Sequence, residues 1–314
     1  MFLAMLLVLI VVPSVLATRP GRNGQVIVGW ASGPSGNSPP AGLLVVSPQT
    51  GQVSMLRAPS NVRAIVLFSP RGLHQMLALT ARGGYELLNS ETEVLRSVRF
   101  GFQPESWSPD GRWIAGVGPA GPADPGSLDV YVSRTDGSDA RRLTHGARVV
   151  SVSWSSRNEI AVATAQSLLL GRRLVAGRIL VMDPFGRHVR AIYSPEHGPQ
   201  WGYPFAIDWS PNGQLLTFAA GRPSGPSPVR NFIVDREGHG TRVIRVKFKT
   251  GAYSTASWSP DGKALLWYTG DSIYLTATDG SDPRLLLNAD ISAIPTSPTG
   301  LHQITLFDPA WQPL

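Results

Sequence analysis

The 314-residue sequence contains no cysteine. This absence excludes disulfide bonds, thiolate metal sites and cysteine nucleophiles. Charged residues are also scarce, at 16% of the chain, against roughly 25% in an average soluble domain. The 27 prolines argue against a protein of long helices, because proline interrupts a helix. The hydrophobic content of 42% is too high for a disordered chain, so a globular, turn-rich protein is predicted.

Lysine is nearly absent as well, so the formal net charge of +7 comes almost wholly from arginine. The arginines are scattered, with adjacent pairs only at 141–142 and 172–173. Nucleic-acid-binding proteins more often show a clustered basic stripe, so we expect no nucleic-acid partner. A basic surface favours acidic partners, such as anionic envelope polymers, through an attraction that salt weakens.

The N-terminal residues 1–17 are apolar and carry no charged side chain. Val15 and Ala17 fit the −3 and −1 positions of a signal-peptidase site, so cleavage after Ala17 is predicted. No Lys or Arg precedes the run, which leaves open an uncleaved anchor in which residues 2–17 tether the chain to a membrane. A buried N-terminal strand or helix is the remaining alternative. We expect an exported protein, periplasmic, in the cell envelope or extracellular, with residues 18–23 as a short linker.

An internal repeat runs through residues 24–314. The sequence SWSPDG occurs at 106–111 and again at 257–262, and DWSPNG occurs at 208–213. The spacing of about 49 residues matches a four-stranded propeller blade, which takes roughly 40–50 residues. The six aromatic positions of the repeat are Phe68, Trp107, Trp154, Trp209, Trp258 and Trp311.

Two tight turns are expected in each repeat. In WSPDG, Pro fixes φ, Asp can bond its own backbone and Gly accepts a positive φ, so this turn joins the first two strands, a and b. Asp-Gly-Ser, at 136–138 and 279–281, is expected to join strands c and d. The sequence therefore predicts an all-β, six-bladed β-propeller of four-stranded blades. The residues assigned to the first turn are Asp110, Gly111, Gly213, Asp261 and Gly262.

The two ends of the repeat complement each other. Residues 26–32, 42–48 and 52–57 supply strands b, c and d of one blade without a strand a. The strand ending at Trp311 has no strands b, c and d after it. The C-terminal strand should therefore complete the first blade beside residues 26–32, which closes the ring and protects the sheet edges. We expect the closed ring to be monomeric.

The order of WSPDG, a VYV-type strand, DGS and RLT resembles the TolB-type propeller family, also called the WD40-like or PD40 repeat, over about residues 24–314. The resemblance implies the fold and no particular activity. TolB itself carries an α/β domain ahead of its propeller. Here the repeat begins close behind the predicted cleavage site, so we expect no such domain and infer no role in the Tol–Pal system.

The b–c loops and d–a connections should share one face of the disc, and several are long. Elaborated loops on a rigid scaffold often carry binding sites, although a long loop also packs on itself. Two polar residues, His145 and Asp208, are further candidates for positions near the channel. The expected long segments are 32–41, 118–127, 164–177, 194–204, 220–229 and 288–302. The candidate binding residues are His197, Trp201, Tyr203, Arg222 and His302.

Catalytic motifs were sought in the sequence and not found. The chain has no HExxH, GxSxG or Walker motif, so no metal site, cofactor or enzyme activity is predicted. The leading interpretation is a non-catalytic, exported propeller that binds a protein, peptide or envelope polymer through the loop-bearing face. One alternative is a channel-mouth hydrolase or lyase that acts on a lactone or saccharide with metal or acid/base residues. The other is a membrane-tethered sensor or accessory subunit.

Overall fold

A computed structural model describes residues 22–32, 40–70, 73–122, 124, 126–168, 173–175, 177–194, 202–221, 229–248, 254–289 and 304–313. These residues form strands and connections, and none of them forms a helix that could cross a membrane. The predicted signal segment, 1–17, lies outside the described residues. The first strand begins at Asn23, the last residue of the predicted linker.

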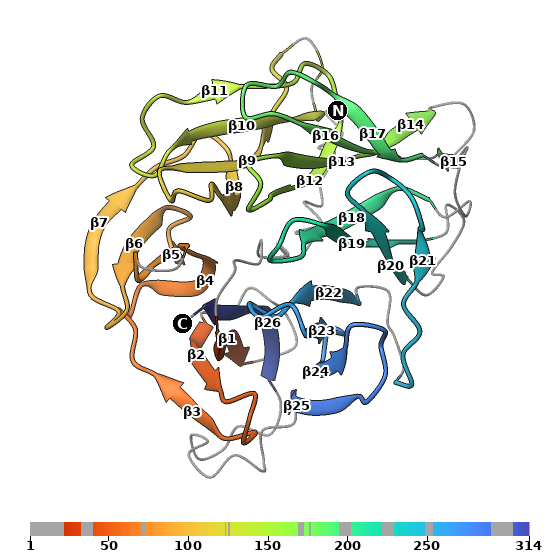
Figure 1. Ribbon diagram of the computed structural model, residues 1–314. Coiled ribbons are helices and arrows are strands. Elements are labelled where there is room, and N and C mark those ends of the chain that lie inside the picture. Colours follow the sequence, from red (N-terminus) through yellow and green to blue (C-terminus); the bar gives the residue numbers. More distant parts are fainter. Residues whose placement is uncertain are drawn as a thin grey trace, which may run out of the picture.

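Six four-stranded antiparallel sheets are arranged around a centre, as Figure 1 shows. The prediction of an all-β, six-bladed propeller is therefore confirmed. Blade 1 contains β26 (Ile304–Pro313), β1 (Asn23–Ser32), β2 (Pro40–Val46) and β3 (Val53–Leu56). Blade 2 contains β4 (Val62–Phe68), β5 (Gln75–Thr80), β6 (Tyr85–Asn89) and β7 (Val94–Val98). Blade 3 contains β8 (Gln103–Trp107), β9 (Trp113–Pro119), β10 (Leu128–Arg134) and β11 (Arg141–Arg142).

The remaining three blades follow in chain order. Blade 4 contains β12 (Val149–Trp154), β13 (Ile160–Thr164), β16 (Ile179–Met182) and β17 (Arg190–Tyr193). Blade 5 contains β18 (Pro204–Trp209), β19 (Leu215–Ala220), β20 (Arg230–Asp235) and β21 (Arg242–Val243). Blade 6 contains β22 (Thr255–Trp258), β23 (Ala264–Tyr268), β24 (Ser272–Ala277) and β25 (Arg284–Asn288). The four strands of each blade, in the order given above, are strands a, b, c and d. Strand a lies nearest the centre and strand d at the rim (Figure 1).

The C-terminal strand closes the ring as predicted. Strand β26 pairs antiparallel with β1, with Val26 opposite Trp311 and Ile27 opposite Ala310. Blade 1 is thus built from both ends of the described chain, and β26 is its strand a.

One long connection contains a sheet of its own. In blade 4 the segment between strands b and c forms a two-stranded hairpin, β14 (Gln166–Leu168) and β15 (Arg173–Val175). The sequence reading treated 164–177 as a plain loop, because three-residue strands are too short to show a period. We call the side of the disc that carries the b–c and d–a connections the loop face, and the side of the a–b turns the turn face.

The hydrophobic core lies between neighbouring blades. Trp154 shares a core cluster with Val117 and Val130 of blade 3, and Trp209 shares one with Ile179 of blade 4. Each of the six repeat aromatics is at most 8% exposed. A tryptophan therefore fills the space toward the preceding blade, where its large area stabilises the contact.

The a–b turns have the conformation that the motif requires. Gly111 and Gly262 both have φ of 71°, which favours glycine, and Gly213 has φ of 65°. Asp110 Oδ1 accepts hydrogen bonds from Ser108 Oγ at 2.6 Å and Arg112 N at 3.1 Å, and Asp261 forms the same pattern in blade 6.

Blade 4 departs from this pattern at one position. Asn158 stands where the other copies have glycine, with φ of 61°. Its Oδ1 accepts a hydrogen bond from Trp154 Nε1 at 3.0 Å. Asparagine tolerates this backbone region and here also satisfies the indole N–H of the repeat tryptophan.

The inner edge of the ring is joined by side-chain to backbone hydrogen bonds. In blades 3, 4 and 5 the side chain before the repeat tryptophan accepts from the backbone N–H of the tryptophan in the next blade. Ser106 Oγ accepts from Trp154 N at 2.8 Å, and Asp208 Oδ2 accepts from Trp258 N at 2.8 Å. Ser153 repeats the contact at 3.3 Å. Asp208 is fully buried, so it is a link between blades rather than an open channel group.

The outer edge of the ring is joined by close backbone approach. A Cβ placed on Gly186 or Gly238, in the c–d turns of blades 4 and 5, would lie 2.9 Å from a carbonyl oxygen of the preceding blade. Blade 2 has Thr92 at this position, with φ of 67°, and its Oγ1 donates to Arg57 O at 2.6 Å. The c–d glycine is thus needed for its lack of a side chain as well as for its positive φ.

Candidate functional site

Tyr203 is the one predicted binding residue that the structure describes. It lies in the d–a connection before β18, half-buried, with its ring centroid 6.0 Å from that of Phe205. A Cβ placed on Gly177, at the end of the b–c connection of blade 4, would lie 2.8 Å from Tyr203 Cβ. Tyr203 therefore packs where the two kinds of connection meet on the loop face. The predicted residues outside the described part are His197, Trp201, Arg222 and His302.

A pocket of about 660 Å³ opens on the loop face at blade 2. Its walls come from the b–c turn, from strands β6 and β7, and from the d–a connections on either side of the blade. It is therefore on the predicted face but at a different blade from Tyr203. The lining residues are Asn61, Thr80, Arg82, Gly83, Gly84, Tyr85, Glu86, Ser97, Val98, Arg99 and Phe100.

The pocket lies at a short connection rather than a long one. Residues 81–84 join β5 to β6 in a tight turn, in which Thr80 N donates to Gly84 O at 2.8 Å and Gly84 N donates to Thr80 Oγ1 at 3.1 Å. The sequence favoured the long loops as binding sites, whereas this pocket is formed at the short turn of residues 81–84. A short turn leaves the ends of β6 and β7 to form the wall of the pocket.

Glu86 carries the negative charge of the pocket. Its side chain is nine-tenths buried, and its Oε1 accepts a hydrogen bond from Asn61 Nδ2 at 2.7 Å. Its Oε2 is buried and has no donor among the described residues. A buried acceptor without a donor costs free energy, so this carboxylate is not explained by the fold alone. The sequence contained one signal for it, an acidic residue inside the otherwise apolar strand YELLN.

Positive and aromatic side chains complete the pocket. Arg82 and Arg99 are exposed and make no ion pair within the described part of the chain. The rings of Tyr85 and Phe100 lie edge to face, with centroids 5.5 Å apart. Burial, helped by the charge of Glu105, raises the pKa of Tyr85 to about 12, so its hydroxyl keeps its proton at neutral pH. The pocket thus combines the carboxylate of Glu86, two guanidinium groups and an aromatic wall.

Glu105 is a second buried carboxyl in this part of the ring. It lies in β8, and its Oε2 accepts a hydrogen bond from Val152 N of blade 4 at 2.7 Å. Burial raises its pKa to about 8, although the hydrogen bond from Val152 opposes the shift. Burial therefore favours the protonated form of Glu105. It acts on the pKa of Tyr85 but is not among the residues that line the pocket.

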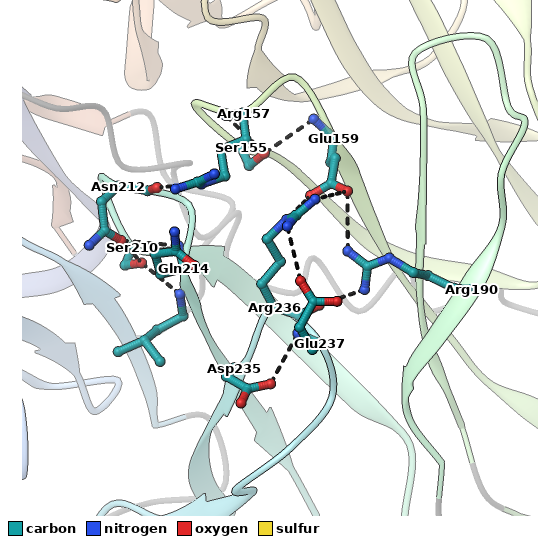
Figure 2. Close-up of polar contacts among 11 residues, drawn as sticks. Ser155, Arg157, Glu159, Arg190, Ser210, Asn212, Gln214, Asp235, Arg236 and Glu237 are labelled. Carbon is teal, nitrogen blue, oxygen red and sulfur yellow. Dashed lines mark hydrogen bonds and ion pairs between the residues drawn. The ribbon is translucent and has the colours of Figure 1, made fainter.

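A cluster of charged residues also lies where the a–b turn of blade 4 meets blade 5 (Figure 2). Glu159 accepts from Arg236 Nε at 2.7 Å and from Arg190 Nη2 at 3.1 Å. Burial opposes the ionisation of Glu159, but the hydrogen bonds from both arginines outweigh it and lower its pKa. The charges of this cluster satisfy one another, so we interpret it as a link between blades 4 and 5 rather than as a binding site.

Metal-binding clusters were sought across the described residues. No group of three His, Asp or Glu side chains that could hold a metal ion occurs among them. His145 is exposed, on the connection that follows β11. The predicted channel candidates, His145 and Asp208, therefore do not form a common site.

Comparison with known proteins identifies the fold. No protein-family model and no curated protein sequence matches the chain. TolB from Acinetobacter baumannii is 16% identical with a TM-score of 0.62, over 94% of this chain and 68% of that one. A putative TolB from Agrobacterium tumefaciens is 20% identical with a TM-score of 0.57, over 80% and 88%. An oligogalacturonate lyase in complex with manganese is 12% identical with a TM-score of 0.55, over 88% and 77%. The chain has a TolB-like propeller fold, which an enzyme also uses, so the fold alone does not decide function.

Proposed function

We propose that this chain is an exported, non-catalytic propeller that binds a protein, peptide or envelope polymer through its loop face. The observation that carries the proposal is the pocket at blade 2, where Arg82 and Arg99 make no ion pair with the described chain and Glu86 Oε2 has no donor there. A rigid ring with unpartnered polar groups on one face is well suited to binding, because the scaffold holds the groups in place. Export is supported by the apolar segment 1–17 and its small residues at the predicted cleavage site.

Retention of envelope material on the immobilised chain, residues 18–314, tests this proposal. Protein and polymer fractions are passed over the chain and over two variants, Tyr203→Ala on the loop face and Phe185→Ala in the c–d turn of blade 4. Phe185 is 60% exposed, so it controls for the loss of an aromatic surface. We expect a saturable ligand whose retention falls with Tyr203→Ala and persists with Phe185→Ala. A ligand lost only with Phe185→Ala would overturn the choice of face.

A hydrolase or lyase that acts on a lactone or saccharide is the second candidate. The propeller fold that this chain shares with an oligogalacturonate lyase supports this candidate. Mass spectrometry of the ligand recovered from the column separates the two functions. An unchanged ligand supports binding. Shortened or opened products that disappear with Glu86→Gln, which changes the carboxyl that lines the pocket, would establish catalysis.

A further inference from the structure

We propose that the pocket at blade 2 binds a hydroxylated carboxylate, such as an acidic sugar unit of an envelope polysaccharide. This inference rests on the proposed function and narrows its ligand class. It follows from three properties of the lining. One oxygen of the Glu86 carboxylate has no hydrogen-bond donor among the described residues, two arginines have no anionic partner there, and two aromatic rings form a wall.

The carboxylate of Glu86 requires a hydrogen-bond donor from the ligand. Asn61 supplies the donor to Oε1, and Oε2 has none among the described residues. Glu86 lines the pocket but its Oε2 is buried, so a donor on the occupant reaches this oxygen when the lining adjusts around the occupant. A simple anion without a hydroxyl or N–H group would only add repulsion there, so such an anion is disfavoured.

Arg82 and Arg99 favour a ligand that also carries a negative group. The lining carries Arg82 and Arg99 against Glu86, so its formal charge is two positive minus one negative, or +1. A cationic ligand is repelled by this balance, although it would suit Glu86 taken alone. The ligand that fits both demands is an anion that also carries hydroxyl groups, since guanidinium groups bind carboxylates well.

The aromatic residues favour a sugar ring over a peptide end. Tyr85 and Phe100 present apolar ring surface beside the polar groups. A pyranose has an apolar C–H face and a rim of hydroxyls, which matches this division of the lining. The volume of about 660 Å³ is within the range of about 300–1,000 Å³ typical of ligand sites.

Calorimetric titration of the full chain with D-glucuronate tests the inference. D-glucose has a hydroxymethyl group in place of the carboxylate, D-glucosamine in addition has a cationic amine in place of the C2 hydroxyl, and glycylglycine represents a peptide end. We expect saturable binding of glucuronate, at least about fivefold weaker binding of glucose and none of glucosamine. Raising the salt to about 0.5 M should weaken glucuronate binding about fivefold, because both arginines are exposed.

Three variants assign the binding to the pocket. Glu86→Gln keeps an oxygen for Asn61 but removes the charge, so binding should fall about tenfold while the thermal midpoint stays equal or rises. A purely structural Glu86 would instead lower the midpoint. Arg99→Gln should weaken binding about fivefold. Arg112→Gln makes the same chemical change in the a–b turn of blade 3, and binding should be unchanged.

Several results would overturn the inference: no saturable binding of glucuronate, stronger binding of glucosamine or glycylglycine, or binding that both Glu86→Gln and Arg99→Gln leave intact. The proposed function is judged separately by retention of envelope material. If that material is retained in a Tyr203-dependent way while glucuronate does not bind, only the sugar inference fails. If no envelope ligand depends on the loop face, the proposed function itself fails.

Discussion

The inner and outer edges of the ring hold neighbouring blades together by different physical means. At the inner edge, buried polar side chains such as Ser106 and Asp208 accept hydrogen bonds from the backbone of the next blade. At the outer edge, the c–d turns approach the preceding blade so closely that Gly186 and Gly238 have no room for a Cβ. The inner contact thus depends on hydrogen bonds from buried polar side chains. The outer contact depends on the absence of a side chain at the c–d glycine.

The largest effect is expected from removing the strand that completes the inner edge of blade 1. A chain ending at His302 lacks β26, so β1 loses one of its two partner strands and the core between blades 1 and 6 loses Trp311. We expect loss of the whole cooperative transition, which for a folded domain is worth about 5–15 kcal/mol. Denaturant unfolding followed by tryptophan fluorescence measures this, with a chain ending at Pro313 as the control. An unchanged midpoint and cooperativity for the shorter chain would show that the ring does not need closure.

The inner edge should respond to pH through Glu105. The pKa of this carboxyl is raised from 4.5 to about 8 in the folded chain, so the folded state holds a proton that the unfolded state has lost. Its contribution to stability is therefore full below pH 4.5, declines as the pH rises toward 8, and is lost above that. Glu105→Gln should leave stability similar at pH 4 and raise it by up to about 5 kcal/mol at pH 9. An equal difference between variant and parent at both pH values would contradict the assignment.

The outer edge should respond to a single methyl group. Gly280, in the c–d turn of blade 6, has φ of 88°, and a Cβ there would overlap the carbonyl oxygen of Arg245. We expect Gly280→Ala to cost about 3 kcal/mol, because backbone must move. Gly262→Ala, in the a–b turn of the same blade, would place its Cβ 3.6 Å from Pro211 Cδ. It should cost only about 1 kcal/mol, the strain of its positive φ. Equal losses in the two variants would remove the distinction between the edges.

The smallest effect concerns the a–b turn of blade 4, in which Asn158 takes the place of glycine. Asn158→Gly removes the acceptor of Trp154 Nε1 and relieves the backbone, so we expect a net loss of about 1 kcal/mol. Asn158→Ala removes the same acceptor and keeps the strained φ, so its loss should be larger. Thermal denaturation of both variants checks the order, and a more stable Asn158→Ala would contradict it.

The repeated parts of the fold could be predicted from the sequence because their causes are local. The six aromatics, the WSPDG turn and the missing strand a of blade 1 are visible in the order of residues. Ring closure follows from counting strands, and β26 pairs with β1 accordingly. The role of the c–d glycines could only partly be predicted. A DG pair indicates a turn, but the carbonyl of the preceding blade that excludes a side chain lies about one repeat away.

The candidate site was harder to predict because its residues come from unrelated positions. Asn61, Glu86 and Arg99 belong to a connection, a strand and another connection, and no motif joins them. The prediction relied on loop length and therefore selected residues on the long segments. Of those candidate residues, the structure describes Tyr203. The informative signal was instead a charge inside an apolar strand, since a buried carboxylate rarely occurs without a partner.

Closure of the ring by β26 also determines when blade 1 can be completed during synthesis of the chain. At its inner side β1 pairs with β26, so the first strand of the described chain lacks this partner until residues 304–313 have been synthesised. Contacts between residues so far apart in sequence form slowly, because a very long loop must be closed first. Until β26 emerges, blade 1 has strands b, c and d with an open inner edge. A growing chain of this design therefore cannot complete blade 1 before residues 304–313 are available.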